Sequence, residues 1–402
     1  MRGTSPTAKP NLLVLASTYP RWPGDPEPGF VHELAKRLTD TFHVIALCPH
    51  AKGAAPTEVL DGVEVIRYRY APAGLETLVN NGGIVTNLRN NRWKLLLVPG
   101  FVLVQAWHAW RLCRQRPIGV VHAHWLLPQG LIAALLGKPF VVTSHGADLY
   151  ALRGRPLQAL KRWVLRRAQS ATVVSRAMRD AVDALGTNMA KVSVVPMGVD
   201  MAGRFVPSDA AQRSRSELLF VGRLVEKKGL RYLLAAMPSV LRARPDVTLT
   251  IAGFGPDEEQ LKAQAHALGL QDAVRFLGAV AQKDLPDLYR RAALFVAPFV
   301  KAKSGDQEGL PVALMEAVAC GCPVVAGDVA GIEDLLGAVK AEICVDARDI
   351  ETLGAKICGE LAHPLQAQAR AQRVLAAAGT HVDWARISEC YARLLMNAAA
   401  KT

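Results

Sequence analysis

Two glutamates, with a predicted helix start between them, form the first pattern in this sequence that could bind a ligand. Glu308 and Glu316 flank the run Gly309, Leu310 and Pro311. Proline suits the first turn of a helix, because its φ angle is already helical and it has no N–H that would need an intrahelical partner. We therefore expect a helix to begin near Leu310.

This helix start is a candidate phosphate site. The amides of Gly309, Leu310 and Val312 would point outward without partners, at the positive end of the helix dipole. Glu308 would lie in the preceding loop and Glu316 about a turn and a half along the helix. Two carboxylates on either side of a diphosphate could bind the hydroxyls of a nucleotide sugar. Taken alone, the pattern is more typical of an ordinary acidic helix start.

A second pattern places two cations after a predicted strand. Gly222 and Arg223 are followed by Lys228 and Gly229. A glycine lets backbone approach a phosphate, and an arginine five residues before a lysine can place two positive charges on one diphosphate. Such charges would stabilise a nucleoside diphosphate as it leaves a sugar. The alternative for this run is a charged turn.

Two other patterns point to chemistry that the rest of the chain does not support. The run from Ala252 to Pro256 resembles half of a dinucleotide-binding fingerprint, but Glu258 stands where the third glycine belongs. A dehydrogenase is therefore not expected. Cys320 and Cys322 have no matching Cys or His pair elsewhere, so we interpret them as small buried side chains and not as metal ligands.

Short apolar strands alternate with helical segments throughout the chain, which predicts parallel sheets covered on both faces. The expected helices include Phe30–Leu38, Pro156–Ala168 and Leu230–Leu241. The expected strands are Asn11–Ser17, His43–Cys48, Val63–Tyr68, Gly119–His122, Phe140–Thr143, Ala171–Val174 and Val192–Val195, then Glu217–Val221, Thr248–Ala252, Val274–Leu277, Leu294–Ala297 and Pro323–Ala326.

The predicted fold class is α/β, with two doubly wound Rossmann-like domains facing across a cleft. Residues 1–197 would form the first domain and residues 198–380 the second. Residues 381–402 would form a C-terminal helix, because the helical segment Asp383–Ala398 has no strand after it and can pack back on the first domain. Ligands of such sheets bind outside the carboxyl ends of the strands, which is where both motifs fall.

Composition limits the class of protein. With 402 residues, half of them apolar, the chain can bury a large core and should form two domains. Its seven cysteines are irregularly spaced, which favours a reducing compartment over a disulfide framework. Residues 1–10 are polar and lead directly into an apolar strand, so we expect no signal peptide and a cytoplasmic location.

The net charge of +13 is concentrated in the first half of the chain. Residues 1–185 carry 23 lysines and arginines against 11 acidic residues, whereas residues 186–402 carry 25 against 24. This asymmetry indicates an anionic partner, such as a membrane face, or serves only solubility. The chain has no zinc finger, helix-turn-helix signal or basic patch interleaved with aromatic residues, so nucleic acid is not an expected partner.

The segment Leu95–Trp107 is almost wholly apolar and has basic residues on both sides: Arg89, Arg92 and Lys94 before it, and Arg111, Arg114 and Arg116 after it. It is too short for a membrane span and is interrupted by Pro99 and Gly100. Two interpretations stay open. The favoured one is a buried domain helix, and the other is a helix lying on an anionic membrane surface.

The order and spacing of these motifs resemble the retaining glycosyltransferases of family 4, of the bacterial polysaccharide and lipid-linked glycan type, which have the GT-B fold. The resemblance covers nearly the whole chain. Its donor-domain motifs are Gly222–Arg223, Lys228–Gly229, Glu308–Pro311 and Glu316–Ala317. Its first-domain motifs are Tyr19–Pro20, Pro28–Phe30, Val121–Trp125, Thr143–Asp148 and Val173–Ser175.

The resemblance implies a role for each donor-side residue. Arg223 and Lys228 would hold the pyrophosphate and stabilise the departing diphosphate. Glu316 would bind the ribose, and Glu308 would touch hydroxyls of the donor sugar. The full implied donor set is Gly29, Gly222, Arg223, Lys228, Gly278, Glu308, Gly309, Leu310, Val312 and Glu316, with backbone near Gly278 reading the base.

The first domain is implied to bind the acceptor. Phe30, His145 and Asp148 would form this side, with His145 beside the anomeric centre and Asp148 ordering its loop. A structural histidine at a strand end is the alternative for His145. His122 and His124 are expected to point to opposite faces of their strand and to be structural. The implied catalytic residues are His145, Glu308, Arg223 and Lys228.

The predicted function is therefore transfer of a sugar, with retention, from a UDP- or GDP-sugar to a glycan or lipid-linked acceptor, as in exopolysaccharide synthesis. No metal or other cofactor is expected, because Arg223, Lys228 and a helix start supply positive charge and the chain has no Asp-x-Asp motif. A nucleotide-sugar epimerase of the same fold and a transferase acting on soluble metabolites are the alternatives. A membrane- or polymer-binding protein without activity is a weaker one. Peripheral attachment of the basic first domain to the inner membrane face would fit a lipid-linked acceptor.

Overall fold

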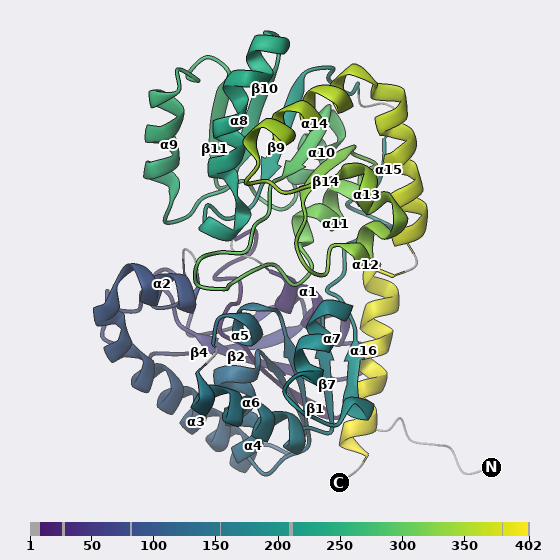
Figure 1. Ribbon diagram of the computed structural model, residues 1–402. Coiled ribbons are helices and arrows are strands. Elements are labelled where there is room, and N and C mark those ends of the chain that lie inside the picture. The colour runs from purple at the N-terminus through teal and green to yellow at the C-terminus, as the bar shows by residue number, and fades with distance from the viewer. Residues whose placement is uncertain are drawn as a thin grey trace, which may run out of the picture. The chain divides into compact units, whose positions relative to one another are not determined.

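The computed structural model describes residues 9–25, 29–80, 83–152, 154–208, 212–379 and 381–400. Two parts of the sequence predictions lie outside these ranges. One is Pro28 of the motif Pro28–Phe30, and the other is residues 1–8, part of the segment in which no signal peptide was expected. The chain divides into two compact units (Figure 1). The first comprises residues 1–173, 179–195 and 388–402, and the second comprises residues 174–178 and 196–387.

The first unit is built on an eight-stranded sheet with the order β3-β4-β2-β1-β5-β6-β7-β8. All neighbouring strands are parallel except β3 and β4, which form an antiparallel pair. The strands are β1 (Asn11–Leu15), β2 (His43–Pro49), β3 (Thr57–Leu60), β4 (Val63–Tyr68), β5 (Ile118–His124), β6 (Phe140–Ser144), β7 (Ser170–Val173) and β8 (Val192–Val194).

The second unit has a parallel six-stranded sheet with the order β11-β10-β9-β12-β13-β14. Its strands are β9 (Glu217–Val221), β10 (Thr248–Ala252), β11 (Val274–Gly278), β12 (Leu294–Ala297), β13 (Val324–Gly327) and β14 (Cys344–Val345). Two doubly wound sheets confirm the predicted fold class. The strands that the sequence did not predict are β3, which is largely exposed, and β14, which has two residues.

Helices connect the parallel strands in both units. Those before β9 are α1 (Phe30–Arg37), α2 (Ile84–Asn90), η1 (Arg92–Leu96), α3 (Leu97–Gln115), η2 (Leu126–Gly130), α4 (Leu131–Leu135), α5 (Ala147–Tyr150), α6 (Arg155–Arg167), α7 (Arg176–Asp183) and η3 (Met189–Lys191). Those after β9 are η4 (Glu226–Lys228), α8 (Leu230–Ala243), α9 (Glu258–Ala267), α10 (Leu285–Arg291), α11 (Val312–Ala319), α12 (Glu333–Leu336), η5 (Gly337–Val339), α13 (Lys340–Ile343), α14 (Ile350–Ala362), α15 (Pro364–Ala378) and α16 (Trp384–Ala399).

Each sheet has a point where the strand order reverses. In the first sheet β1 lies between β2 and β5, and in the second β9 lies between β10 and β12. Loops that leave the carboxyl ends of strands at such a point form the binding edge of a doubly wound sheet. The predicted motifs follow β1, β5 and β6 in the first unit and β9 and β12 in the second, so the topology gathers the motifs of each unit at one sheet edge.

Residues 388–402, which include most of α16, belong to the first unit. The phenol of Tyr391, on α16, is fully buried. Its oxygen lies 3.2 Å from Thr172 Oγ1 and 3.5 Å from Thr143 Oγ1, and its hydroxyl donates to the carbonyl oxygen of Val195 at 3.5 Å. These contacts fasten the C-terminal helix to β6, β7 and the chain after β8.

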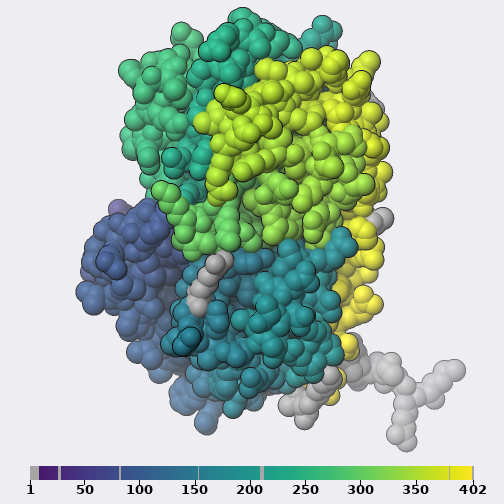
Figure 2. Space-filling model, viewed as in Figure 1, coloured from purple at the N-terminus to yellow at the C-terminus, as the bar shows by residue number. Residues whose placement is uncertain are grey.

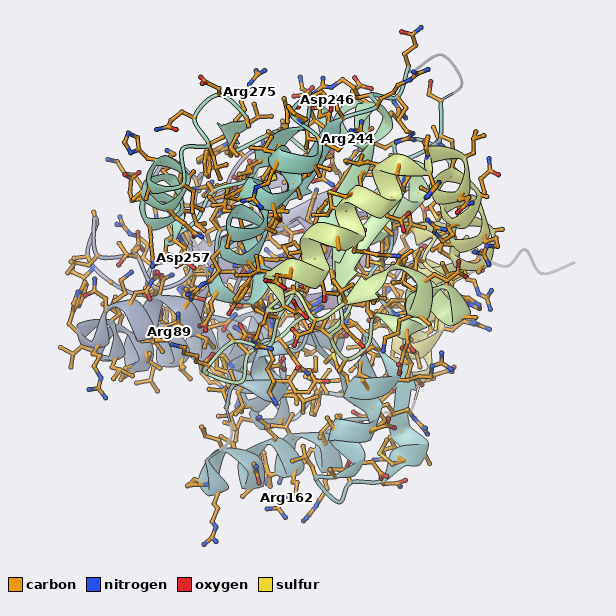
Figure 3. The ribbon with its side chains drawn as sticks, turned by 45° about the horizontal axis from the view of Figure 1, so that its top comes forward. Arg89, Arg162, Arg244, Asp246, Asp257 and Arg275 are labelled. Atoms are coloured by element: carbon orange, nitrogen blue, oxygen red, sulfur yellow. The ribbon has the colours of Figure 1, made fainter. Side chains whose placement is uncertain are left out.

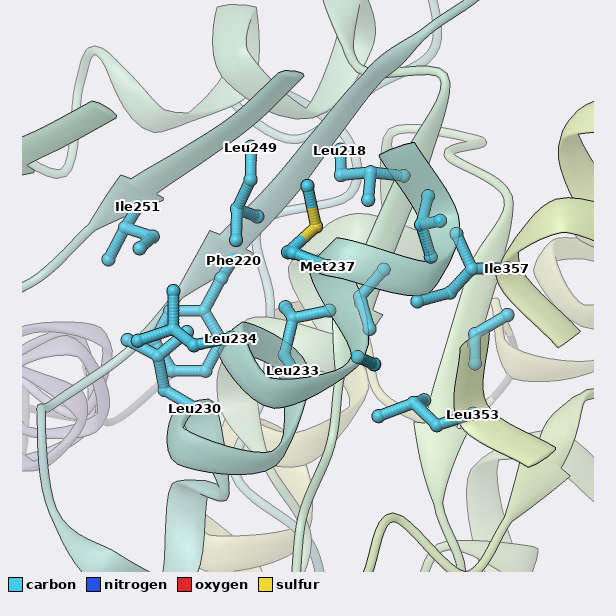
Figure 4. Packing of buried hydrophobic residues seen from close by; sticks show 14 of the residues in the cluster. Leu218, Phe220, Leu230, Leu233, Leu234, Met237, Leu249, Ile251, Leu353 and Ile357 are labelled. Carbon is cyan, nitrogen blue, oxygen red and sulfur yellow. The ribbon is translucent and has the colours of Figure 1, made fainter. Parts of the chain in front are cut away.

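The core of the second unit lies where α8 and α14 cover the sheet (Figure 4). Leu233, Leu234 and Met237 of α8 are fully buried against Leu249 and neighbouring strand residues. Full burial of a leucine contributes roughly 1.5–3 kcal/mol, so this cluster stabilises the second unit behind the binding edge of its sheet. The α8–β10 turn carries an ion pair between Arg244 Nε and Asp246 Oδ1 at 3.2 Å (Figure 3).

Two predictions about the segment Leu95–Trp107 were wrong. The first was an interruption at Pro99 and Gly100. The segment instead runs from η1 into α3 without a break, because Pro99 falls in the first turn of α3, where an N–H would have no intrahelical acceptor. The segment is also not a buried helix. One face is buried at Phe101 and Gln105, but Leu103 is 67% and Trp107 50% exposed.

The prediction that His122 and His124 point to opposite faces of their strand was also wrong. Their ring centroids are only 4.2 Å apart, so the two side chains lie on the same face of β5. The prediction was wrong because side chains alternate along a strand, and residues two apart therefore share a face. His122 is fully buried and its Nε2 lies 2.8 Å from Thr143 Oγ1, which fits the structural role expected for it.

We predict that replacing Gly229 with alanine destabilises the second unit and weakens its ligand site. Gly229 has φ +71°, and an added Cβ would lie 1.7 Å from the carbonyl oxygen of Pro298. Gly269 is the matched control, because it has φ +69° and no atom within 4 Å of an added Cβ. Both alanines incur backbone strain of about 1 kcal/mol. Urea unfolding should show a further loss of at least about 2 kcal/mol for Gly229→Ala, from the backbone clash. Equal losses in the two variants would contradict this.

Candidate active site

The cations predicted to bind phosphate follow β9 directly. The chain leaves the strand at Val221, passes Gly222 and Arg223, and makes the short 3₁₀ turn η4 that ends at Lys228. Gly229 then adopts the left-handed conformation and begins α8. The tight turn before α8 therefore carries Arg223 and Lys228 at the binding edge of the second sheet.

A buried ion cluster joins this turn to the loop after β12. Glu308 lies between two lysines: Oε1 is 3.5 Å from Lys227 Nζ, and Oε2 is 3.4 Å from Lys228 Nζ. Lys227 Nζ is also 3.3 Å from Asp306 Oδ1. Lys228 Nζ lies 5.0 Å above the ring centre of Phe299, in cation–π contact. The sequence analysis gave Glu308 and Lys228 separate donor-side roles, and it gave Lys227 and Asp306 no role.

The electrostatics of the cluster are set by an excess of positive charge. Burial alone would raise the pKa of Glu308, but the charges of Lys227, Lys228 and Arg223 outweigh it and lower that pKa to about 2. Burial, with the neighbouring cations, lowers the pKa of Lys228. Burial disfavours the charge of Lys227, but Glu308 and Asp306 raise its pKa overall. Such a cluster is suited to an anion that brings further negative charge.

Arg223 is the cation of this group that the described residues leave available. Its guanidinium forms no hydrogen bond or ion pair with them, although its charge acts on Glu308. The Oε1 atom of Glu308 is buried and likewise accepts no hydrogen bond within the described part of the chain. The site therefore offers an unpaired guanidinium and an unsatisfied carboxylate oxygen close to the same lysines.

The predicted helix start is present, shifted by two residues. Helix α11 begins at Val312, and Pro311 is its N-cap with an extended ψ of 120°. Proline is therefore the residue before the first turn and not part of it, and its carbonyl accepts from the amides of Leu314 and Met315. Within the described ranges, the amides of Gly309, Leu310 and Val312 find no acceptor. The positive end of the helix dipole thus carries the free donors that were predicted.

Glu316 lies in α11 and is 4% exposed. Its Oε1 accepts from Gln282 Nε2 at 2.5 Å, and its Oε2 accepts from the hydroxyl of Tyr289 at 2.9 Å. Burial raises the pKa of Glu316 to about 7, although both hydrogen bonds favour the charged form. The sequence did not identify Gln282 or Tyr289, because neither stands in a motif and both reach Glu316 only through the fold.

Gly278, the remaining predicted donor-side residue, ends β11 at the same sheet edge. It has φ +70° and open space around an added Cβ, and its carbonyl accepts from the amide of Gly253 at 2.8 Å. The second unit thus gathers the predicted residues after β9, β11 and β12 and on α11, the helix that follows β12.

The first unit gathers an aromatic group around His145. The imidazole stacks on that of His124, with ring centroids 5.2 Å apart and planes 8° apart, and His145 Nε2 lies 3.0 Å from His124 Nδ1. Phe30 and Trp125 also pack against it, at centroid distances of 4.8 and 5.0 Å. Burial, with His122, lowers the pKa of His145 to about 3, so the ring is neutral at physiological pH. Trp125 ends the motif Val121–Trp125, but the sequence analysis gave it no role of its own.

Asp148 connects the two loops beside this aromatic group. Its Oδ2 accepts from the amide of Leu126 at 2.6 Å, after β5, and its Oδ1 accepts from Ser144 Oγ at 2.9 Å and the amide of His145 at 3.3 Å. Burial raises the pKa of this carboxyl, which is 3% exposed. Asp148 therefore orders the loops after β5 and β6 by hydrogen bonds, in line with the ordering role expected for it. Its side chain is too buried to offer much surface to a ligand.

Gly29 immediately precedes α1 and accepts a helix hydrogen bond from the amide of Glu33 at 2.8 Å. Its φ of −91° is open to any residue, and an added Cβ would make only an ordinary contact with Pro20 at 3.7 Å. The backbone therefore does not itself require glycine here. Within the described residues, no group of three or more His, Cys, Asp and Glu side chains is arranged to hold a metal ion.

The two doubly wound sheets define the GT-B architecture, and sequence comparison assigns the family. The model described as Glycosyltransferase Family 4 matches residues 30–202, and the model described as Glycosyl transferases group 1 matches residues 207–372. The chain belongs to glycosyltransferase family 4. It is a transferase that uses nucleotide-sugar donors.

Individual relatives agree with this assignment. The chain is 27% identical to glycogen synthase of Mycobacterium tuberculosis over 396 residues, which cover 92% of this chain and 90% of that enzyme. It is 32% identical over 262 residues to the GDP-mannose-dependent alpha-(1-6)-phosphatidylinositol monomannoside mannosyltransferase of Mycolicibacterium smegmatis, covering 62% and 65% of the two chains. The fold is similar to that of Anabaena Alr3699/HepE, solved in complex with UDP and glucose, with TM-score 0.72, 17% identity and coverage of 96% and 99%.

We predict that Glu316 makes the free energy of unfolding depend on pH near neutrality. Glu316 has a pKa of about 7 in the folded chain and the ordinary value of 4.5 when the chain is unfolded. At pH values between these two, it therefore holds a proton only in the native state. Its contribution to stability is full below about pH 4.5 and is lost as pH rises through about 7, a change of up to about 3 kcal/mol.

Urea unfolding of the wild type and of Glu316→Gln between about pH 5 and about pH 8 tests this. The wild type should lose stability relative to the variant as pH rises. Glu308→Gln is the matched control, because the pKa of Glu308 is about 2 and that carboxylate does not titrate in this range. A constant difference between the wild type and Glu316→Gln would overturn the assignment.

Proposed function

We propose that this glycosyltransferase moves a sugar from a UDP- or GDP-sugar to a hydroxyl of a glycan or lipid-linked acceptor, with retention of anomeric configuration. Its product would enter exopolysaccharide or lipid-linked glycan synthesis on the cytoplasmic side of the membrane. The cation cluster at the start of α11 is the observation that carries the proposal. The names of its relatives, a glycogen synthase and a GDP-mannose-dependent mannosyltransferase, support a carbohydrate or lipid-linked acceptor.

The cluster fits a diphosphate by charge and by number of donors. The side chain of Arg223 has no partner among the described residues, Lys228 is held beside Glu308, and the amides of Gly309, Leu310 and Val312 find no acceptor there. A pyrophosphate placed here would receive charge-assisted hydrogen bonds from both side chains and from the helix start. The same contacts strengthen when the sugar–oxygen bond breaks, because negative charge then develops on the diphosphate.

The proposed chemistry needs no covalent intermediate. The bond between the anomeric carbon and the diphosphate oxygen breaks, the acceptor oxygen bonds to the same face of that carbon, and the acceptor proton passes to the leaving phosphate oxygen. Glu308 is ionised but held between two lysines, which makes it a poor nucleophile. Its buried Oε1, which accepts no hydrogen bond within the described residues, is instead available to a donor-sugar hydroxyl. The positive charge that a metal would bring is supplied by Arg223, Lys228 and the start of α11.

The remaining predicted roles are part of the same proposal. Glu316 binds the ribose hydroxyls, exchanging or sharing its bonds to Gln282 and Tyr289. His145, neutral at physiological pH, offers a hydrogen bond to the sugar and not a charge. Phe30 packs against His145 and gives the acceptor an apolar ring surface.

Thermal stabilisation by a panel of nucleoside diphosphates and nucleotide sugars tests the donor site. Ligand at a hundredfold excess over its dissociation constant should add roughly 2.7 kcal/mol to the wild type. Arg223→Ala and Glu316→Ala should reduce the response. The matched control is Arg242→Ala, which removes an equal charge from an exposed position on α8 of the same unit. A wild type that responds to none of these ligands would contradict the proposal, as would equal responses in Arg223→Ala and Arg242→Ala.

The reaction product separates the remaining alternatives. Proton NMR of a reaction with an α-linked donor and a glycan or lipid-linked acceptor should show a new α linkage. Conversion of one nucleotide sugar into another without acceptor would instead identify an epimerase, and transfer only to small soluble alcohols would replace the proposed acceptor class. A β-linked product, or a glycosyl adduct trapped on Glu308, would rule out the proposed same-face attack.

A further inference from the structure

Helix α3 has two apolar faces, and the first unit covers only one of them. Phe101, Gln105 and Ala109 follow one another at four-residue intervals on the inner face. Gln105 is fully buried, and its amide donates to the carbonyl oxygens of Ala16 at 3.2 Å and Leu47 at 3.4 Å. These contacts with the ends of β1 and β2 fix the helix on the sheet.

The opposite face carries large apolar side chains that nothing in the described chain covers. Leu96 is 81% exposed, Leu103 67%, Trp107 50% and Trp110 49%. At 100° per residue these four positions fall within about 60° of one another around the helix axis, and Phe101 and Gln105 lie on the far side. Single exposed apolar residues are common, but a row of two leucines and two tryptophans along one helix indicates an interaction surface.

Basic side chains complete this outer face. Arg111 lies 5.5 Å from the ring centre of Trp107, and Arg114 lies 5.2 Å from that of Trp110. Residues 77–147 contain seven lysines and arginines and no aspartate or glutamate. We define the outer face of α3 as Leu96, Leu103, Trp107, Trp110, Arg111 and Arg114. Figure 2 shows the surface of this part of the chain in blue.

Residues Arg92–Gln115 are long and apolar enough to cross a membrane by length and composition. The hydrogen bonds of Gln105 to Ala16, just after β1, and to Leu47, on β2, show that this helix is instead packed on the sheet of its unit. A helix held in this way can present its outer face to a membrane but cannot span one.

We propose that the outer face of α3 docks the protein on an anionic lipid surface. Tryptophan places its ring at the boundary between acyl chains and headgroups, and leucine reaches further into the apolar region. Arginines beside those rings extend their guanidinium groups to lipid phosphates. The face has both components, in adjacent positions and with no acidic residue on the helix.

Charge favours lipid over a second copy of the chain. In a two-fold dimer the same patch meets itself, so the arginines of one copy would face those of the other or its tryptophans. No carboxylate on α3, or anywhere in residues 77–147, could compensate them. An anionic bilayer supplies that compensation and accommodates the apolar row at the same time.

Co-sedimentation of the full chain with vesicles tests the proposal. The vesicles contain either phosphatidylcholine alone or equal parts of phosphatidylcholine and phosphatidylglycerol. The wild type should bind the anionic vesicles at least about tenfold more tightly, and added salt should weaken this binding. Both Leu103→Gln/Trp107→Gln and Arg111→Gln/Arg114→Gln should lower binding by about tenfold or more.

Matched controls make equivalent changes elsewhere. Val59→Gln/Leu365→Gln removes two other exposed apolar side chains, and Arg166→Gln/Arg179→Gln removes two other exposed arginines from the first unit. These variants should bind as the wild type does. Circular dichroism and the unfolding midpoint verify that the α3 variants are folded, since all four altered side chains are exposed.

Two results would overturn the proposal. In the first, the wild-type protein does not sediment with anionic vesicles. In the second, the α3 variants bind these vesicles as tightly as their matched controls do. A dimer detected by sedimentation velocity that disappears in Leu103→Gln/Trp107→Gln would assign the face to a second copy. This proposal does not depend on the donor site. Arg223→Ala should therefore lose its response to nucleotides but bind vesicles as the wild type does, which would support both the donor site and the docking face.

Discussion

The ion cluster of Glu308 with Lys227 and Lys228 is the interaction on which the donor side depends. The three cations of the proposed diphosphate site repel one another when no ligand is bound, and burial increases the energetic cost of that repulsion. Glu308 offsets the repulsion, since it lies within 3.5 Å of both lysines and remains ionised. The cluster also joins the turn after β9 to the loop after β12, across the point where the strand order of the second sheet reverses.

The candidate site residues of the two units differ in chemical character. In the second unit they are charged: lysines and an arginine lie near a carboxylate and a helix start, which suits an anionic ligand. The first unit uses a neutral aromatic group, His145 with His124, Phe30 and Trp125, whose loops are held by the buried carboxylate of Asp148. In both, the functional side chains follow strand ends and are fixed by buried partners behind them.

The sequence predicted most of the fold, because parallel strands are short, apolar and regularly spaced. It also singled out Arg223, Lys228, Glu308 and Glu316 by the spacing of local motifs, and the fold brings these residues to one edge of the second sheet. Their roles remain predictions. It could not predict Lys227, Gln282 or Tyr289, whose partners are distant in the sequence. The errors have physical causes. Pro311 caps α11 and does not start it, and the histidines of β5 share a face because strands repeat every two residues. Helix α3 was expected to be buried because apolar composition does not distinguish a core face from a docking face.

The central claim is that the charge of this cluster recognises a diphosphate. Calorimetric affinities of UDP, UMP, GDP and GMP for the wild type and for Arg223→Met test it most directly, because Arg223 has no partner in the described chain and its loss should not disturb folding. The account predicts that the diphosphate of the preferred base binds at least about tenfold more tightly than its monophosphate, and that Arg223→Met removes most of this difference. Equal affinities in the wild type, or an unchanged difference in the variant, would contradict it.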